Sequence, residues 1–246
     1  MKTLCTILFV FFLHQSVFAQ SEYQKIKISD DLELIKISES AYIHISHIAL
    51  SQVGRFPSNG MVIISEGKAF LFDTPMTEEL TRQLALWIQD TMKLKIMGFI
   101  PNHWHADCMG GLEYLQNLGI ESYANEMTIQ IAKSKQLPVP TYGFKDSLQL
   151  FAGNKAIHCY YFGAGHSSDN IVVWIPSEKI LFGGCMVKEL SANGLGNIVD
   201  ADLKAWPRTL DKVLKKFHNA RIVVPGHGKP GGVELLRQTK ELLIAK

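Results

Sequence analysis

The 246-residue sequence lacks internal repeats, low-complexity tracts and an excess of one charge. It has 25 basic and 23 acidic residues, so neither nucleic acid nor an acidic surface is indicated as a partner. No linker-like run interrupts residues 20–246, and 47% of the sequence is hydrophobic. We therefore expect one large globular domain over residues 20–246, acting as a monomer.

Long apolar runs are also missing, and the one apolar stretch near the start, residues 7–13, is too short to cross a bilayer as a helix. Lys2 supplies a positive start before this stretch, and Ala19 ends the segment. This order is typical of a secretory signal peptide. We expect residues 1–19 to be removed, which lowers the net charge from +2 to +1, and the mature protein to reside in the periplasm without membrane attachment.

Cysteine is scarce, with four residues in the whole chain. Cys5 falls in the expected signal peptide, which leaves Cys108, Cys159 and Cys185. An odd number of cysteines in an exported protein leaves at least one thiol unpaired within the chain. Metal ligation would explain such a thiol, and we expect it of Cys185. A buried inert thiol is the alternative, and we expect it of Cys159.

The spacing of apolar residues predicts an α/β fold. Alternating or continuous apolar runs predict strands, and apolar residues three or four apart predict helices. Both halves of the chain show strands followed by helices, which predicts two sheets packed face to face with helices outside. The expected strands are residues 32–37, 42–47, 61–65, 69–72, 96–100, 148–151, 156–162, 171–175, 179–182 and 222–224, and the expected helices are residues 80–91, 112–118, 129–133, 206–217 and 233–243.

The segment His103-Trp104-His105-Ala106-Asp107 follows one of these strands and holds two imidazoles and a carboxylate. Both groups are ligands that suit zinc. In an extended segment or tight loop, His103 and His105 point the same way, and Asp107 continues the alternation. A loop with two surface histidines is the alternative interpretation.

Three more candidate ligands lie where an apolar strand runs into a glycine-rich turn, an arrangement that brings distant segments to one sheet end. They are His166, Cys185 and His227. Each one alone could be a polar turn residue facing water. Together the six candidates exceed the needs of one tetrahedral zinc and suffice for two. Three imidazoles at one zinc, with a carboxylate, a thiolate and an imidazole at the other, would leave each metal an open position typical of catalysis.

This ligand set resembles that of the subclass B1 metallo-β-lactamases. The similarity covers essentially the whole mature chain and includes residues 123–125, 169–174 and 225–228. The resemblance implies an αββα sandwich with mixed sheets and a two-zinc site at the sheet edges. It also implies zinc-dependent hydrolysis of the amide bond in penicillins, cephalosporins and carbapenems, which confers antibiotic resistance. In that family pattern the first zinc takes His103, His105 and His166, and the second takes Asp107, Cys185 and His227.

The resemblance also suggests residues that contact substrate. Lys188, three residues after Cys185, matches the Cys-Xaa-Xaa-Lys pattern of the family and would bind the substrate carboxylate. Asn197 would help to hold the carbonyl oxygen, although its glycine-rich loop could place an Asn for turn geometry alone. Asp107 would orient the attacking water.

Two other functions are alternatives to β-lactam hydrolysis. A thioesterase or lactonase of the same fold usually has a His directly after the motif Asp and a bridging Asp in place of Cys185. Cys108 and Cys185 stand there instead and favour the β-lactamase branch. We expect Cys108 to lie beside the second zinc without binding it, with tuning of that zinc as the alternative. A structural or storage zinc protein would need neither Lys188 nor open positions. No Ser-Xaa-Xaa-Lys nucleophile with its partner motifs is found.

Some further expectations concern the surroundings of the site. Residues 46–57 predict a hairpin with Gly54 near its tip, which in the family closes over substrate; a hairpin that packs on its own domain is the alternative. Asp73, at a strand end, is a candidate hydrogen-bond partner of a ligand. The remaining histidines are interpreted as structural or surface residues; they are His44, His47, His158 and His218.

Overall fold

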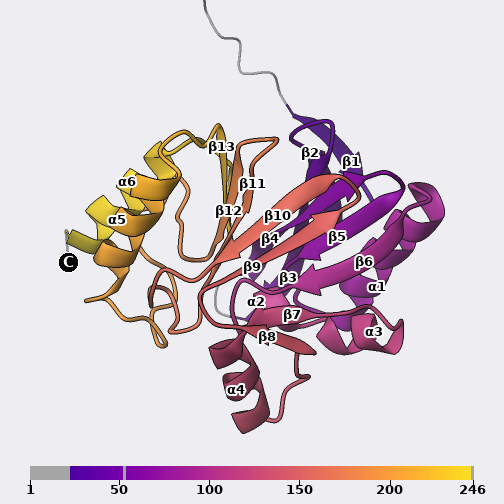
Figure 1. The fold of residues 1–246 in the computed structure, drawn as a ribbon, viewed down its shortest axis with the longest axis horizontal. Coiled ribbons are helices and arrows are strands. Elements are labelled where there is room, and N and C mark those ends of the chain that lie inside the picture. Colours follow the sequence, from indigo (N-terminus) through magenta and orange to yellow (C-terminus); the bar gives the residue numbers. More distant parts are fainter. Residues whose placement is uncertain (1–22, 52–53, 245–246) are drawn as a thin grey trace, which may run out of the picture.

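A computed structural model of the chain describes residues 23–51 and 54–244, so the expected signal peptide lies outside the described residues. Along the chain, runs of strands are followed by helices, as Figure 1 shows. In chain order the elements are β1 (Gln24–Lys27), β2 (Leu32–Lys36), β3 (Ala41–Leu50), β4 (Gly54–Ser65), β5 (Lys68–Phe72), α1 (Glu78–Leu86), η1 (Trp87–Thr91), β6 (Lys95–Ile100), α2 (Ala106–Met109), α3 (Leu112–Asn117), β7 (Tyr123–Asn125), α4 (Glu126–Ser134), β8 (Tyr142–Phe144), β9 (Ser147–Ala152), β10 (Lys155–Tyr160), β11 (Val172–Ile175), β12 (Ile180–Gly184), α5 (Trp206–Lys216), β13 (Ile222–Pro225) and α6 (Glu234–Ile244).

The strands form two large sheets and one small one. The first large sheet has the order β1-β2-β3-β4-β5-β6 and is antiparallel except between β5 and β6. The second has the order β13-β12-β11-β10-β9, with a parallel pair only between β12 and β13. A short parallel pair of β7 and β8 lies beside them. Both large sheets are therefore mixed, as expected from the family resemblance.

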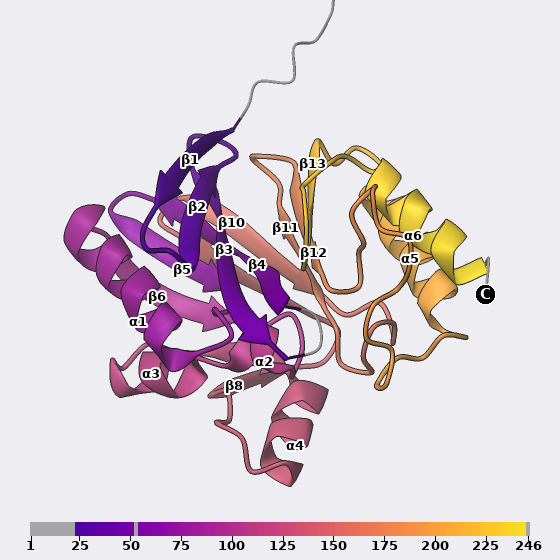
Figure 2. The same cartoon turned by 180° about the vertical axis from the view of Figure 1, so that it is seen from behind.

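Three apolar cores separate four layers. The central core joins the facing sides of the two sheets, where the Phe72 and Phe182 rings lie 6.4 Å apart. A second core packs the outer face of the first sheet against Leu84 of α1 and Leu112 of α3. A third packs the second sheet against α5, with Trp206 fully buried. Figures 1 and 2 show these helices on opposite sides of the two sheets. The αββα sandwich is confirmed.

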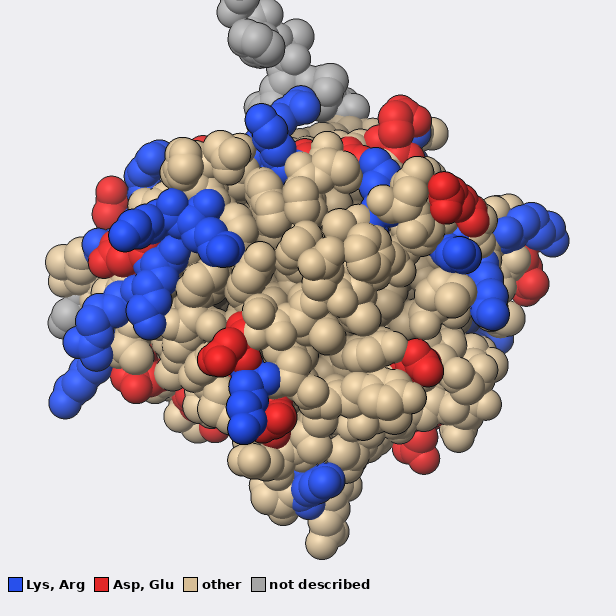
Figure 3. Space-filling view, viewed as in Figure 1, with Lys and Arg blue, Asp and Glu red and all other residues tan. Residues whose placement is uncertain are grey.

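The surface carries charges of both signs on the face seen in Figure 3, with Lys and Arg more numerous at the end covered by α5 and α6. Two lysines, Lys215 and Lys216, end α5. Among the described residues no helix combines the length and hydropathy needed to cross a membrane.

The expected hairpin is present and is longer than the sequence predicted. β3 and β4 pair continuously from Ala41 opposite Ile63 to Leu50 opposite Gly54. Gly54 begins β4 with a φ of +74°, a left-handed conformation that glycine adopts without strain. The pairs up to Ser46 opposite Ser58 lie where β3 also pairs with β2, and the last four pairs, from His47 opposite Pro57 to Leu50 opposite Gly54, extend beyond that pairing.

Asn102 ties the two sheets together directly before the first candidate ligand. Its backbone N–H donates to the Asp73 carboxylate, and its carbonyl accepts from Ile171 N–H at 2.9 Å. Its side chain fills the space beside Gly184, where a Cβ would lie 2.3 Å from the Asn102 amide carbon. Glycine at 184, with a φ of +56°, is thus required for the close approach of β12 to the segment after β6.

Candidate metal centre

The first group of candidate ligands contains three imidazoles. Ligand atoms of His103, His105 and His166 all lie within 4.8 Å of one another. His103 Nε2 and His105 Nδ1 are 2.8 Å apart, and the His103 and His166 ring centroids are 4.8 Å apart. His103 and His105 come from the loop after β6, and His166 from the loop after β10. The structure thus brings together the three residues expected at the first zinc.

The donor chemistry of this group fits a metal ion. Burial, together with the charges of His103 and Lys188, holds the pKa of His166 well below its ordinary value. The imidazole is therefore neutral, the form that ligates metals. Its Nδ1 atom is buried without a hydrogen-bond partner among the described residues.

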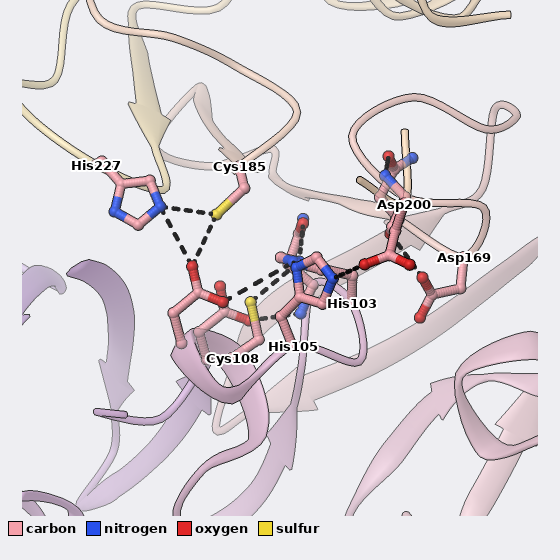
Figure 4. Close-up of polar contacts among 12 residues, drawn as sticks. His103, His105, Cys108, Asp169, Cys185, Asp200 and His227 are labelled. Carbon is pink, nitrogen blue, oxygen red and sulfur yellow. Dashed lines mark hydrogen bonds and ion pairs between the residues drawn. The ribbon is translucent and has the colours of Figure 1, made fainter. Parts of the chain in front are cut away.

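The second group contains a carboxylate, a thiol and an imidazole. Cys185 Sγ lies 3.3 Å from Asp107 Oδ2 and 3.3 Å from His227 Nε2, and these last two atoms are 3.2 Å apart. Figure 4 shows Cys185 and His227 pointing toward one another from two different segments. The three residues are the set expected at the second zinc.

Asp107 reaches the second group by a route that the sequence did not predict. His105 is extended, with φ −67° and ψ 162°, and it is the N-cap of α2. The chain turns helical at Ala106, so Asp107 does not continue the alternation of the two histidines. That expectation was wrong, because a strand-like period was extended across a helix start. The turn is what sends the Asp107 carboxylate to Cys185 and His227.

Charges within the second group favour the ionised, ligand-competent forms of Asp107 and Cys185, and the same two side chains raise the pKa of His227. Burial would raise the pKa of Asp107, but the hydrogen bond from His227 and the charge of His103 outweigh it and hold that pKa well below its usual range. A hydrogen bond from Cys108 likewise holds the pKa of the Cys185 thiol well below its usual range. Carboxylate and thiolate are the ionised forms that bind metals.

Cys108 lies between the two groups. Its sulfur is 3.1 Å from His103 Nδ1, and it falls within 4.8 Å of ligand atoms of Asp107 and Cys185. The thiol is therefore beside the second group, as expected, and close enough to belong to a cluster that could hold an ion. That it binds no metal stays a prediction. Cys159, by contrast, is buried in the core between the sheets, which agrees with the expected inert thiol.

Two candidate ligands donate hydrogen bonds to partners that sequence reasoning missed. His105 Nε2 lies 2.9 Å from Asp200 Oδ2, and His227 Nδ1 lies 2.8 Å from the Pro57 carbonyl oxygen. Asp73, expected to contact a ligand, instead accepts from the backbone of Asn102 and so supports the ligand segment. Neither Asp200 nor Pro57 belongs to a motif that could have indicated it.

A cavity of about 600 Å³ opens over both groups. Besides the ligands, it is lined by Leu50 and Phe56 of the hairpin and by Lys188 and Asn197. Lys188 is only 9% exposed, and burial lowers the pKa of its amine. The Asn197 Oδ1 atom accepts from Val199 N–H at 3.1 Å, so the turn-forming role considered for Asn197 is real and occupies its oxygen.

Comparison with known proteins identifies the family. The model of the metallo-β-lactamase superfamily matches residues 53–227. The chain belongs to the metallo-β-lactamase superfamily. A metallo-β-lactamase type 2 from Bacteroides fragilis, the enzyme called CcrA or CfiA, is 51% identical over 220 residues, which cover 89% of this chain and 88% of that protein.

Solved structures of metallo-β-lactamases agree with this placement. The enzyme from Pontibacter korlensis has a TM-score of 0.85 and 37% identity, over 87% of this chain and 100% of its own. The DIM-1 metallo-β-lactamase exposed to ceftazidime has a TM-score of 0.83 and 36% identity, over 87% of this chain and 97% of its own. The structural neighbours are of the B1 type, as the sequence resemblance implied.

The four remaining described histidines belong to neither metal group of this metallo-β-lactamase fold. His44 is buried against the Asp73 carbonyl oxygen, and burial lowers its pKa to about 4. His218 lies at the surface, where its Nδ1 is 3.3 Å from the Lys215 carbonyl oxygen. Their interpretation as structural or surface residues is consistent with these contacts.

Proposed function

We propose that the mature chain is a two-zinc hydrolase that opens the β-lactam ring of penicillins, cephalosporins and carbapenems. One observation carries the proposal: two triads of ligand atoms lie side by side on one cavity, with a buried amine beside them. Residues His103, His105 and His166 would hold the first zinc, and Asp107, Cys185 and His227 the second. When bound, zinc supplies a Lewis acid and lowers the pKa of a bound water to near neutrality.

The protein itself supplies charge and orientation. Asp107 is ionised and has a second carboxylate oxygen with which it can accept a hydrogen bond from the attacking water and so orient it. Lys188 is nine-tenths buried, and its amine is suited to bind the carboxylate that β-lactams carry near the scissile amide. A charge pair involving such a buried amine is stronger than one between groups in water.

Asn197 is proposed to assist at the carbonyl oxygen of the substrate. Its own carbonyl is engaged in a turn with Val199, which fixes the side chain and leaves the amide nitrogen as the group that can donate. Asn197 also lines the cavity, as do Leu50 and Phe56 of the hairpin. A fixed donor near the developing negative charge favours the transition state.

The alternative of a thioesterase or lactonase is disfavoured by the two sulfur residues at the second group, Cys108 and Cys185. Storage or structural zinc is disfavoured because both groups face an open cavity rather than a closed one. We also propose that the protein acts in the periplasm, since the first nineteen residues have the pattern of an export signal. There it would act as a monomer and confer antibiotic resistance by hydrolysing β-lactams.

The test is an assay of the purified mature chain with measured metal content. We expect close to two zinc ions per chain and hydrolysis of a penicillin, a cephalosporin and a carbapenem that stops when a chelator is added and returns when zinc is restored. A thioester and a lactone serve as matched control substrates. Two bound zincs without ring opening of any β-lactam, or faster turnover of the control substrates, would contradict the proposal.

A further inference from the structure

The side chain of Asn59, in the middle of β4, reaches from the first sheet to the loop that carries His227. Its Nδ2 donates to the carbonyl oxygens of Pro225 at 2.9 Å and Gly228 at 2.8 Å. Its backbone N–H donates to the carbonyl oxygen of Gly226 at 2.8 Å. Three hydrogen bonds from one residue thus hold the carbonyls on both sides of a metal-ligand candidate.

The residues just before Asn59 contact the imidazole itself. The Pro57 carbonyl oxygen accepts from His227 Nδ1–H at 2.8 Å, and the Phe56 ring lies 4.9 Å from the His227 ring between centroids. The Nδ1 hydrogen is held by this carbonyl oxygen, so Nε2, which faces Asp107 and Cys185, is the nitrogen that can bind a metal once its own proton is displaced. Phe56, Pro57 and Asn59 therefore set the position of His227 and keep a proton on its Nδ1.

The loop has little freedom to move without disturbing the other ligands. A Cβ on Gly226 would lie 2.4 Å from Cys185 Sγ, so the loop backbone is pressed against the thiol. Any shift of residues 225–228 would change the distances from His227 to Cys185 and Asp107 together. Metal sites tolerate only small departures from their preferred ligand distances.

Asn59 is not explained by packing alone. It is 2% exposed, and its Oδ1 atom is buried without a hydrogen-bond partner among the described residues. Burial of an unsatisfied amide oxygen costs free energy, and an apolar residue would suit a buried strand better. Both amide hydrogens, however, go to the His227 loop.

We propose that Asn59 is a positioning residue for the second metal: it holds the His227 loop in place and connects the β3–β4 hairpin to a ligand of that metal. The inference rests on the proposed zinc site at Asp107, Cys185 and His227, and not on the identity of the substrate. Leu50 and Phe56 on the same hairpin line the cavity, and Phe56 also contacts the His227 ring. A displacement of the hairpin would therefore also displace His227.

The experiment compares Asn59→Ala with Ser58→Ala in the full mature protein. Ser58 is the neighbouring strand residue, is also 2% exposed, and its hydroxyl bonds to Ser46 at 2.9 Å rather than to the loop. We expect Asn59→Ala to weaken the second zinc by about 10- to 100-fold, as loss of a partner behind a ligand does, while the first zinc is retained. Ser58→Ala should bind both zincs as the unmodified protein does.

Cobalt substitution supplies a readout that does not depend on activity. Only the second triad contains a thiolate, so sulfur-to-cobalt charge-transfer absorption reports that group. In Asn59→Ala this band should require more cobalt than in Ser58→Ala, with the imidazole group still filled first. Equal cobalt and zinc titrations for the two variants, or an equal loss at both groups, would overturn the inference.

A second variant protects the test against misfolding. If Asn59→Ala does not fold, Asn59→Ser keeps one donor in a small polar side chain and should show a smaller loss confined to the same zinc. Wild-type affinity in Asn59→Ser would overturn the inference. A protein that binds two zincs but opens no β-lactam would contradict the proposed function and leave the Asn59 measurement unaffected.

Discussion

At the scale of single residues, two candidate metal ligands donate a hydrogen bond from the ring nitrogen that faces away from their group. His105 uses Nδ1 toward the first group and Nε2 toward Asp200, while His227 uses Nε2 toward the second group and Nδ1 toward Pro57. Each outer contact selects one tautomer and one ring orientation. A carboxylate partner additionally raises the basicity of the ligand, which strengthens metal binding.

Asp200→Asn tests this support at the first group. The substitution keeps the size of the side chain but removes the charge that accepts from His105 Nε2–H. We expect the affinity for the first zinc to fall by about 10- to 100-fold. Titration of zinc against a competing chelator checks this. Asp211→Asn, at an exposed ion pair with Lys240, is the matched control and should not lower this affinity; an unchanged first zinc in Asp200→Asn would refute the assigned role.

The two groups of candidate ligands could be predicted from the sequence, and their supporting contacts could not. His103, His105 and Asp107 stand in one short motif, and each of the other three candidates directly follows a glycine. Asp200 looks like any acidic loop residue, and Pro57 contributes only a backbone carbonyl, for which no side chain is diagnostic. Which carbonyl oxygen accepts from which ring nitrogen depends on how the two sheets pack, and this cannot be predicted from local sequence.

At the scale of secondary structure, the β3–β4 hairpin contributes to the cavity while its base remains in the sheet. Leu50 and Phe56 line the cavity, whereas Ile48 packs against the core under the first sheet. The hairpin packs on its own domain at one end, and its closure over substrate stays a prediction. One end is packed on the protein's own core, and the other end faces the space above the metal groups.

Leu50→Ala tests the contribution of the hairpin to substrate binding. Removal of an apolar contact that is present both before and during ring opening should raise KM and leave kcat nearly unchanged. The loss of roughly 1 kcal/mol of apolar contact corresponds to about a fivefold increase in KM. Steady-state kinetics on a carbapenem measure it. Leu118→Ala, 44% exposed at the end of α3, is the control and should not alter KM; an equal KM for both variants would contradict a role for the hairpin.

Elements with a strong apolar period were predicted well, and short or polar elements were not. β12 is buried throughout and lies close to its predicted bounds. β1 was missed because its residues are mostly exposed and it pairs only with β2 at the sheet edge. β7 and β8 have three residues each, too few to show a period. The predicted helix over residues 80–91 was correct in extent, although its last turn is a π-helix, η1.

At the scale of the whole molecule, the ligands are shared between the two halves of the sandwich. His103, His105 and Asp107 follow the last strand of the first sheet, while His166, Cys185 and His227 come from the connections of the second. Hydrophobic period predicted two sheets, but strand order and the meeting of six side chains depend on long-range pairing that no local pattern encodes. The order of strands and helices predicted two packed sheets with helices outside, the family resemblance added the mixed sheets of an αββα sandwich, and the structure confirms both.

Because both triads are assembled only when the halves fold together, zinc should bind the folded state and stabilise it by mass action. Above the dissociation constants, each tenfold increase in free zinc adds about 1.4 kcal/mol per site to the free energy of unfolding, hence about 2.7 kcal/mol for two sites. Urea unfolding at buffered zinc concentrations measures this slope. Cys185→Ser should reduce it toward about 1.4 kcal/mol per tenfold change, since one site is impaired.

Cys159→Ser separates metal linkage from general destabilisation. Cys159 lies in the core between the sheets, so a hydroxyl there should lower the free energy of unfolding at every zinc concentration. The slope against zinc should nevertheless equal that of the unmodified protein, because neither triad contains Cys159. A one-site slope in the unmodified protein, or equal slopes for the Cys159 and Cys185 variants, would contradict two zinc sites that link the halves of the fold.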